Sequence, residues 1–147
     1  LPADRRSAMA ALFASKCRLP VREAEDKESI AAGTIYFAPP DYHLLVEPGG
    51  FLALSCDAPV MFSRPSIDVL FESAAEAFGP GLLGIVLTGA NADGARGLKA
   101  IVDAGGRAIV QTPASAFAPA MPEAALAACP SAISMTLEEI VAYLEEI

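Results

Sequence analysis

The sequence has few basic residues, a single histidine and no long apolar run. Its 147 residues hold 10 Lys and Arg against 18 Asp and Glu, a formal net charge of −8. Nucleic acids and anionic membranes are bound by clustered Lys and Arg, so this balance argues against both as partners. No apolar stretch approaches the ~18 residues of a transmembrane helix, and no signal-peptide pattern opens the chain. We therefore expect no nucleic-acid binding, no membrane insertion and a cytoplasmic location.

Residues that bind metals are also scarce. Cys17, Cys56 and Cys129 are odd in number and far apart, which excludes a disulfide framework and CxxC zinc spacing and predicts buried thiols in a reducing compartment. His43 is the only histidine. Asp41 would share its face of a strand, but two ligands without a third do not make a metal site. We expect no metal and no cofactor, and a strand-edge or loop position at which His43 makes hydrogen bonds.

The composition that remains is typical of one globular α/β domain. Hydrophobic residues make up 54% of the chain and charged residues 19%, which argues against disorder. Strand and helix patterns alternate in the second half, as in βαβ units on a parallel sheet. We expect one doubly wound α/β domain over residues 1–147, with a mainly parallel sheet and an antiparallel hairpin. The expected helices cover residues 4–15, 66–78, 92–104, 121–128 and 136–147, and the expected strands cover 19–21, 34–38, 42–46, 51–55, 82–87, 107–110 and 131–134.

Several of these elements carry end signals in the sequence. Residues 47–50 (EPGG) separate two β-rich runs and predict a hairpin turn. Ser66 and Asp68 are residue types that cap a helix N-terminus, so we expect them to cap the helix over 66–78. Thr136 and Glu139 fit a capping box at the start of the last helix.

The most informative stretch is residues 82–97, in which an apolar run ends in a small, glycine-rich loop that contains one acid, Asp93. This is the layout of a buried strand that delivers a loop to the carboxyl edge of a parallel sheet, where open α/β folds place their chemistry. An acid there can orient a histidine, hold a metal, cap a helix or bind a ribose. The glycines fit neither the Walker loop nor the GxGxxG fingerprint, and no acid follows the next strand, which disfavours nucleotide binding.

Four short segments follow one another along the chain in an order that is typical of one protein family. They are residues 36–43 (YFAPPDYH), 63–71 (SRPSIDVLF), 87–97 (LTGANADGARG), and 114–115 (AS) followed by 120–122 (AMP). Together they closely resemble the catalytic domain of the chemotaxis protein-glutamate methylesterases, the CheB family. The resemblance covers essentially the whole chain, and its most specific parts are the RPS-hydrophobic-DVLF block and the LTG loop with its acid.

This resemblance implies a serine hydrolase with a Ser-His-Asp triad on a doubly wound sheet. Such enzymes hydrolyse γ-glutamyl methyl esters on chemoreceptors with release of methanol, and many also deamidate receptor glutamines. Carried over by motif, Asp93 is the triad acid and the Ala90 N–H is the oxyanion donor. A phospho-receiver domain in the same polypeptide is the usual regulator of the family. The resemblance further implies substrate binding or support of the active site by Arg64, Thr88, Gly89, Asn91, Gly94 and Met121. For Arg64, the two roles expected are substrate binding and support of the fold.

The sequence also departs from the family pattern. The nucleophile loop, Gly-x-Ser-x-Gly-Gly, has no counterpart, and the triad histidine is expected immediately before Leu1. Residues 90–92 are Ala-Asn-Ala where relatives usually have Met-Gly-Asn, and Ala120 replaces a glycine. We therefore expect an N-terminal truncation of ~40 residues, the size of a strand-helix-strand unit, and no activity from these 147 residues alone. The alternative is a short, non-catalytic relative that acts as a receptor- or partner-binding domain.

Overall fold

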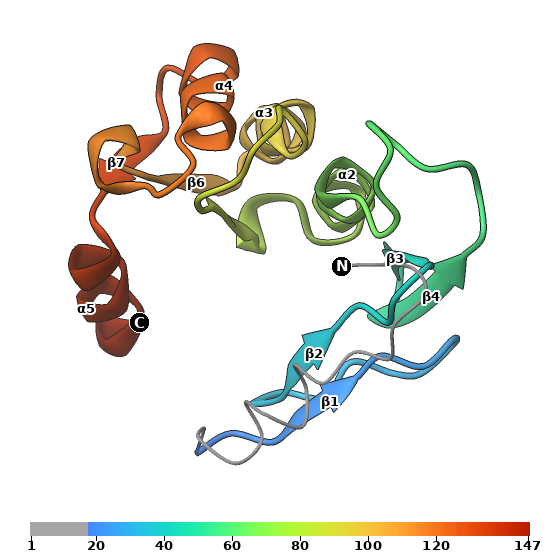
Figure 1. Ribbon diagram of the computed structural model, residues 1–147. Helices are drawn as coiled ribbons and strands as arrows, with labels where there is room; N and C mark the ends of the chain where they lie inside the picture. The colour runs from blue at the N-terminus through green and yellow to red at the C-terminus, as the bar shows by residue number, and fades with distance from the viewer. Residues whose placement is uncertain (1–17) are drawn as a thin grey trace.

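A computed structural model describes residues 18–147, so the helix expected over residues 4–15 and Cys17 lie outside the described residues. The described chain alternates strands and helices (Figure 1). In order these are β1 (Val21–Glu23), β2 (Ile35–Phe37), β3 (His43–Glu47), β4 (Phe51–Ser55), α2 (Ile67–Phe78), the 3-10 turn η1 (Gly79–Gly81), β5 (Leu83–Val86), α3 (Ala95–Asp103), β6 (Arg107–Gln111), the 3-10 turn η2 (Pro113–Ser115), α4 (Ala120–Ala128), β7 (Ile133–Met135) and α5 (Leu137–Glu146).

The C-terminal half is built on a parallel sheet of three strands, in the order β5-β6-β7. Val86 pairs with Val110 on β6, and both side chains are buried. Helices α3 and α4 cover one face of this sheet and α5 lies against the other (Figure 1). Leu98 and Ile101 of α3 fill the core between helix and sheet. The alternating pattern of the sequence thus predicted the layers of this half correctly.

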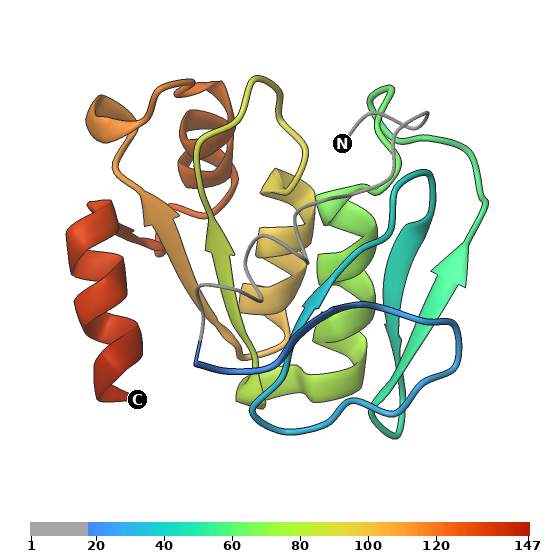
Figure 2. The same cartoon turned by 60° about the horizontal axis from the view of Figure 1, so that its bottom comes forward.

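The N-terminal half contains two strand pairs. Strands β1 and β2 form a short parallel pair, and β3 and β4 form the expected antiparallel hairpin. Gly49 and Gly50 in its turn have φ of 94° and 84°, a backbone conformation that glycine adopts without strain. Helix α2 stands between the hairpin and α3 (Figure 2). It therefore joins the two halves of the molecule.

Glycine allows α2 and α3 to approach closely at their N-terminal ends. A Cβ added at Gly97 would lie 2.6 Å from Cβ of Phe71 and 3.1 Å from Cα of Asp68. Neither atom can move away cheaply, because both belong to the framework of α2. Any residue larger than glycine at this position would push the two helix ends apart.

Some local expectations are wrong. Ser66 occupies the N-cap position of α2 but makes no side-chain cap bond, and the Asp68 carboxylate bonds to α3 instead of to its own helix. Cys56 is exposed rather than buried, whereas Cys129 is buried, and burial raises the pKa of its thiol. The capping box of Thr136 and Glu139 is confirmed. Strand β1 begins at the end of its expected range, and β7 begins two residues after the start of its own.

Candidate active site

Asp93 lies in the loop between β5 and α3 and is 3% exposed. Its Oδ1 accepts hydrogen bonds from the Ser66 hydroxyl at 2.9 Å and from the Asp68 backbone N–H at 3.0 Å. Its Oδ2 accepts from the Ile67 backbone N–H at 2.8 Å. A helix N-terminus presents unpaired N–H groups and partial positive charge, which suits a carboxylate. Asp93 thus caps a helix, but that helix is α2 and not α3, whose N-cap is Gly94.

The hydrogen bonds that Asp93 already accepts show which of its oxygens has a position left for another. An ionised carboxylate has about four acceptor positions, two on each oxygen. The start of α2 occupies both positions on Oδ1 and one on Oδ2. Among residues 18–147 no further donor binds the Asp93 carboxylate, so its remaining acceptor position is on Oδ2.

His43 holds Ser66 in place. The histidine is the first residue of β3 and is 1% exposed. Its Nδ1 accepts the Ser66 N–H at 3.1 Å, and its Nε2 lies 2.9 Å from the Ala58 carbonyl oxygen, to which it donates. This bonding fixes the neutral tautomer with the proton on Nε2. The expectation of a hydrogen-bonding strand-edge histidine is confirmed, and both ring nitrogens are engaged in holding the fold.

The first part of the loop is fastened to the segment before α4. The Thr88 N–H donates to Oε1 of Gln111 at 3.0 Å, and the Thr88 hydroxyl donates to the Ala118 carbonyl at 3.1 Å. Gly89 donates to the same carbonyl, and its own carbonyl accepts the Met121 N–H, both at 3.0 Å. Cβ of Met121 would lie 3.0 Å from a Cβ at position 89, so a side chain there would crowd the loop. Thr88, Gly89 and Met121 thus support the loop.

The tip of the loop carries a backbone N–H that has no acceptor among the described residues. Asn91 Oδ1 accepts the Asp93 N–H at 2.9 Å, an Asx-turn that bends the chain just before the buried acid. Ala90 is exposed, and within residues 18–147 no acceptor binds its N–H. Gly94 follows Asp93 with a φ of 101°, which favours glycine. The loop therefore carries an exposed residue, Ala90, three positions before a buried carboxylate.

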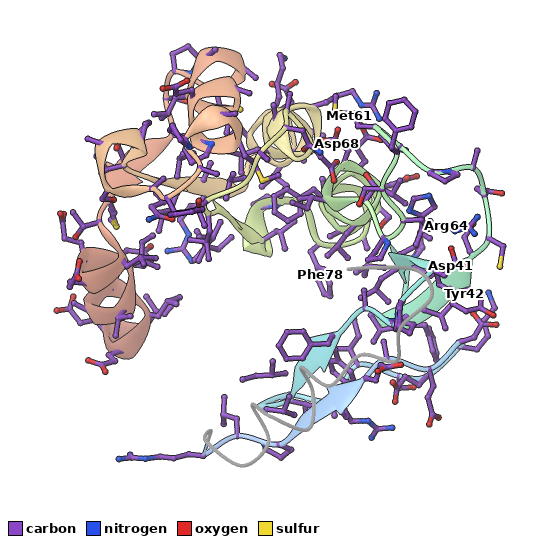
Figure 3. All side chains as sticks on the ribbon, viewed as in Figure 1. Asp41, Tyr42, Met61, Arg64, Asp68 and Phe78 are labelled. Carbon is purple, nitrogen blue, oxygen red and sulfur yellow. The ribbon has the colours of Figure 1, made fainter. Side chains whose placement is uncertain are left out.

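Arg64 is engaged within the fold. Its Nε and Nη2 donate to Oδ1 of Asp41 at 3.0 and 2.6 Å, and its Nη1 donates to the carbonyls of Cys56 and Asp57. Figure 3 shows Arg64 and Asp41 together near the start of β3, apart from Asp68. Asp41 is thus paired with Arg64 rather than placed beside the histidine as a ligand. Of the two roles expected for Arg64, these contacts favour support of the fold.

Asp68 belongs to this site, although the sequence motifs assigned it no role beyond its own helix. The side chain is 1% exposed, and its Oδ1 accepts the Gly97 N–H at 2.7 Å and the Gly94 N–H at 3.0 Å. Burial raises the pKa of Asp68, and the negative charge of nearby Asp93 raises it further. The hydrogen bonds from the Gly94 and Gly97 amides and the charge of Arg96 lower the pKa, but the rise is larger. The only signal in the sequence was an acid near the start of each of two successive helices. Nothing local showed that each acid bonds to the other helix.

The chain is similar over most of its length to proteins of one family. The family model described as CheB methylesterase matches residues 1–144. The chain belongs to the CheB methylesterase family. A relative from Leptospira interrogans, named as a putative protein-glutamate methylesterase/protein-glutamine glutaminase, is 48% identical over 124 residues. A protein-glutamate methylesterase/protein-glutamine glutaminase of Rhodospirillum rubrum is 40% identical over 149 residues.

The matches cover most of this chain but only part of these relatives. The Leptospira match covers 84% of this chain and 64% of the relative, and the Rhodospirillum match covers 98% and 38%. In structure, the chain resembles the CheB methylesterase catalytic domain of Thermotoga maritima, with a TM-score of 0.92 and 26% identity. That match covers 99% of this chain and 79% of the Thermotoga chain. The expected α/β fold of the CheB family is confirmed.

Two features are absent from residues 18–147, the described part of the chain. None of the helices described there has the length and apolar character needed to cross a membrane. The same residues contain no group of three or more His, Cys, Asp and Glu side chains that could hold a metal ion.

Proposed function

We propose that the protein is a protein-glutamate methylesterase that demethylates glutamyl esters on chemoreceptors in the cytoplasm, with Asp93 as its triad acid. The family supports the reaction class. The observation that carries the role of Asp93 is its hydrogen bonding, in which the start of α2 fills three acceptor positions and leaves one on Oδ2. A histidine that donates its Nδ1–H to this position would be held in the tautomer that accepts a proton from serine, and its cation would be stabilised.

The remaining groups of the reaction follow from this assignment. The serine oxygen attacks the ester carbonyl while the histidine takes the serine proton, and the Ala90 N–H donates to the oxygen that becomes negative. The histidine then protonates the departing methoxide to give methanol, and water hydrolyses the acyl-enzyme, which restores the serine and leaves a glutamate carboxylate on the receptor. Deamidation would follow the same steps with ammonia as the leaving group.

The loop residues have supporting roles in the same proposal. Thr88, Gly89 and Met121 hold the loop, and Asn91 and Gly94 shape the turn on either side of Asp93. Chemoreceptors are the proposed partners, and a receiver domain in the same polypeptide is the proposed regulator. The names of the relatives do not favour the alternative of a non-catalytic binding domain.

The decisive test replaces Asp93 in the full-length protein. Asp93→Asn keeps the size of the side chain but removes its charge, so we expect kcat for methanol release from methylated receptor to fall by about 10⁴-fold. Circular dichroism checks that the variant is folded. Asp103→Asn is the matched control, because Asp103 is exposed and, among residues 18–147, pairs only with Lys99. Near-normal turnover in Asp93→Asn would end the triad assignment.

A further inference from the structure

Asp68 and Asp93 exchange helix caps. Asp68, in the first turn of α2, accepts the N–H groups of Gly94 and Gly97 at the start of α3. Asp93, two residues before α3, accepts the N–H groups of Ile67 and Asp68 at the start of α2. The Asp68 carboxylate therefore satisfies unpaired amides at the start of α3, and the Asp93 carboxylate satisfies unpaired amides at the start of α2.

The exchange depends on close packing at this corner. Gly97 lets Cα of Asp68 approach its backbone, and at Gly94 a Cβ would lie 3.1 Å from Cγ2 of Ile67. Asp68 and Asp93 are 1% and 3% exposed, so water does not compete for their hydrogen bonds. In such surroundings a hydrogen bond is stronger, and its loss costs more than at the surface.

We propose that Asp68 is a positioning residue for Asp93 and for the loop that carries the Ala90 amide. Asp68 fixes the backbone at Gly94, the residue directly after Asp93, and so fixes the point from which the Asp93 side chain extends. The consequence for catalysis rests on the proposed function, whereas the coupling of the two carboxylates does not. Asp68 acts through Asp93 and needs no contact with the substrate.

Amide hydrogen exchange tests the coupling without any activity. In the full-length protein, Asp68→Ala should lower the protection of Gly94 and Gly97, which Asp68 bonds directly. It should also lower the protection of Ile67, whose N–H bonds to Asp93 and not to Asp68. Asp68→Asn should preserve all three, because its amide oxygen can accept both glycine N–H groups. Unchanged protection at Ile67 in Asp68→Ala would overturn the proposal and leave Asp68 as a local cap.

Kinetics test the positioning. We expect Asp68→Ala to lower kcat by about 10²-fold with KM within a few-fold, because a small misplacement of the catalytic groups costs rate rather than binding. Asp68→Asn should recover turnover to within about tenfold of the unsubstituted protein on the same argument. Asp103→Asn serves as the control. Equal losses in the Ala and Asn variants, or a loss that matches only the unfolded fraction, would overturn the positioning role.

Two outcomes of these experiments require a further measurement. If Asp68→Ala does not fold, Gly97→Ala displaces Asp68 without removing it, and loss of Ile67 protection in that variant supports the coupling while its retention contradicts it. If the unsubstituted protein releases no methanol, the proposed function fails, and hydrogen exchange still decides whether the two carboxylates depend on each other.

Discussion

Ser66 bonds to two other buried polar side chains at once. Its N–H donates to His43 and its hydroxyl donates to Asp93. Ser66→Ala keeps the first bond and removes the second, so we expect the free energy of unfolding to fall by about 1.5–3 kcal/mol, the usual value for a hydrogen bond to a charged group. Urea denaturation measures this loss. Ser131→Ala is the control, because Ser131 is exposed, and an equal effect in the two variants would contradict the assignment.

Asp68 also makes stability depend on pH. Its pKa in the folded protein is raised above 3.8, chiefly by burial, with Asp93 adding to the shift and Arg96 opposing it. Between 3.8 and the raised value, the folded state binds the Asp68 proton more than the unfolded state does. The contribution of Asp68 to stability therefore falls as pH rises through this window.

The comparison of the unsubstituted protein with Asp68→Asn isolates this effect. The quantity of interest is the free energy of unfolding of Asp68→Asn minus that of the unsubstituted protein. We expect this difference to be higher at neutral pH than at a pH near 3.8, because the amide has no charge to bury at either pH. Denaturant titrations at a series of pH values measure the difference. A difference that stays constant, or that changes in the opposite direction, would show that the Asp68 pKa is not raised.

At the scale of elements, the contact between α2 and α3 tolerates no added side chain. Ala favours a helix over Gly by about 1 kcal/mol, but a methyl group at position 97 would overlap Cβ of Phe71 and crowd Cα of Asp68. We expect overpacking to dominate, with a loss of about 1–3 kcal/mol in Gly97→Ala measured by thermal or urea unfolding. Gly81→Ala is the control, because nothing lies within 4 Å of its added Cβ. Stabilisation by Gly97→Ala would show that the helices separate freely.

Elements with local signals were predictable from the sequence, and contacts between elements were not. The hairpin turn and the capping box at Thr136 depend on residues close together in the chain, and both were confirmed. The caps expected from Ser66 and Asp68 were wrong because their actual partners lie 26 to 29 residues away. The glycine-rich loop identified Asp93 as a candidate. Only the packing of α3 on α2 shows which N–H groups it binds.

At the scale of the whole molecule, α2 belongs to two apolar clusters. Ala75 packs with Val86 and Leu98 in the cluster around the parallel sheet. Ala74, on the same helix, packs with Leu44 and Leu52 in the cluster around the hairpin. Because one helix serves both clusters and Asp93 caps that helix, loss of either cluster should loosen the other. We therefore expect the described part of the chain to unfold as one cooperative unit.

Leu52→Ala tests this cooperativity. The side chain is 4% exposed, so its truncation should cost about 2–5 kcal/mol. Amide exchange in β6, on the far side of α2, should then lose as much protection as exchange in β4, where the substitution lies. Leu137→Ala, at a position 46% exposed, is the control and should change neither strand. If β6 kept its full protection in Leu52→Ala, the hairpin would be an independent unit, and the bonds from Asp93 to α2 would not couple the loop to it. Loss of protection in both strands would mean that the hairpin contributes, through α2, to holding the acid in place.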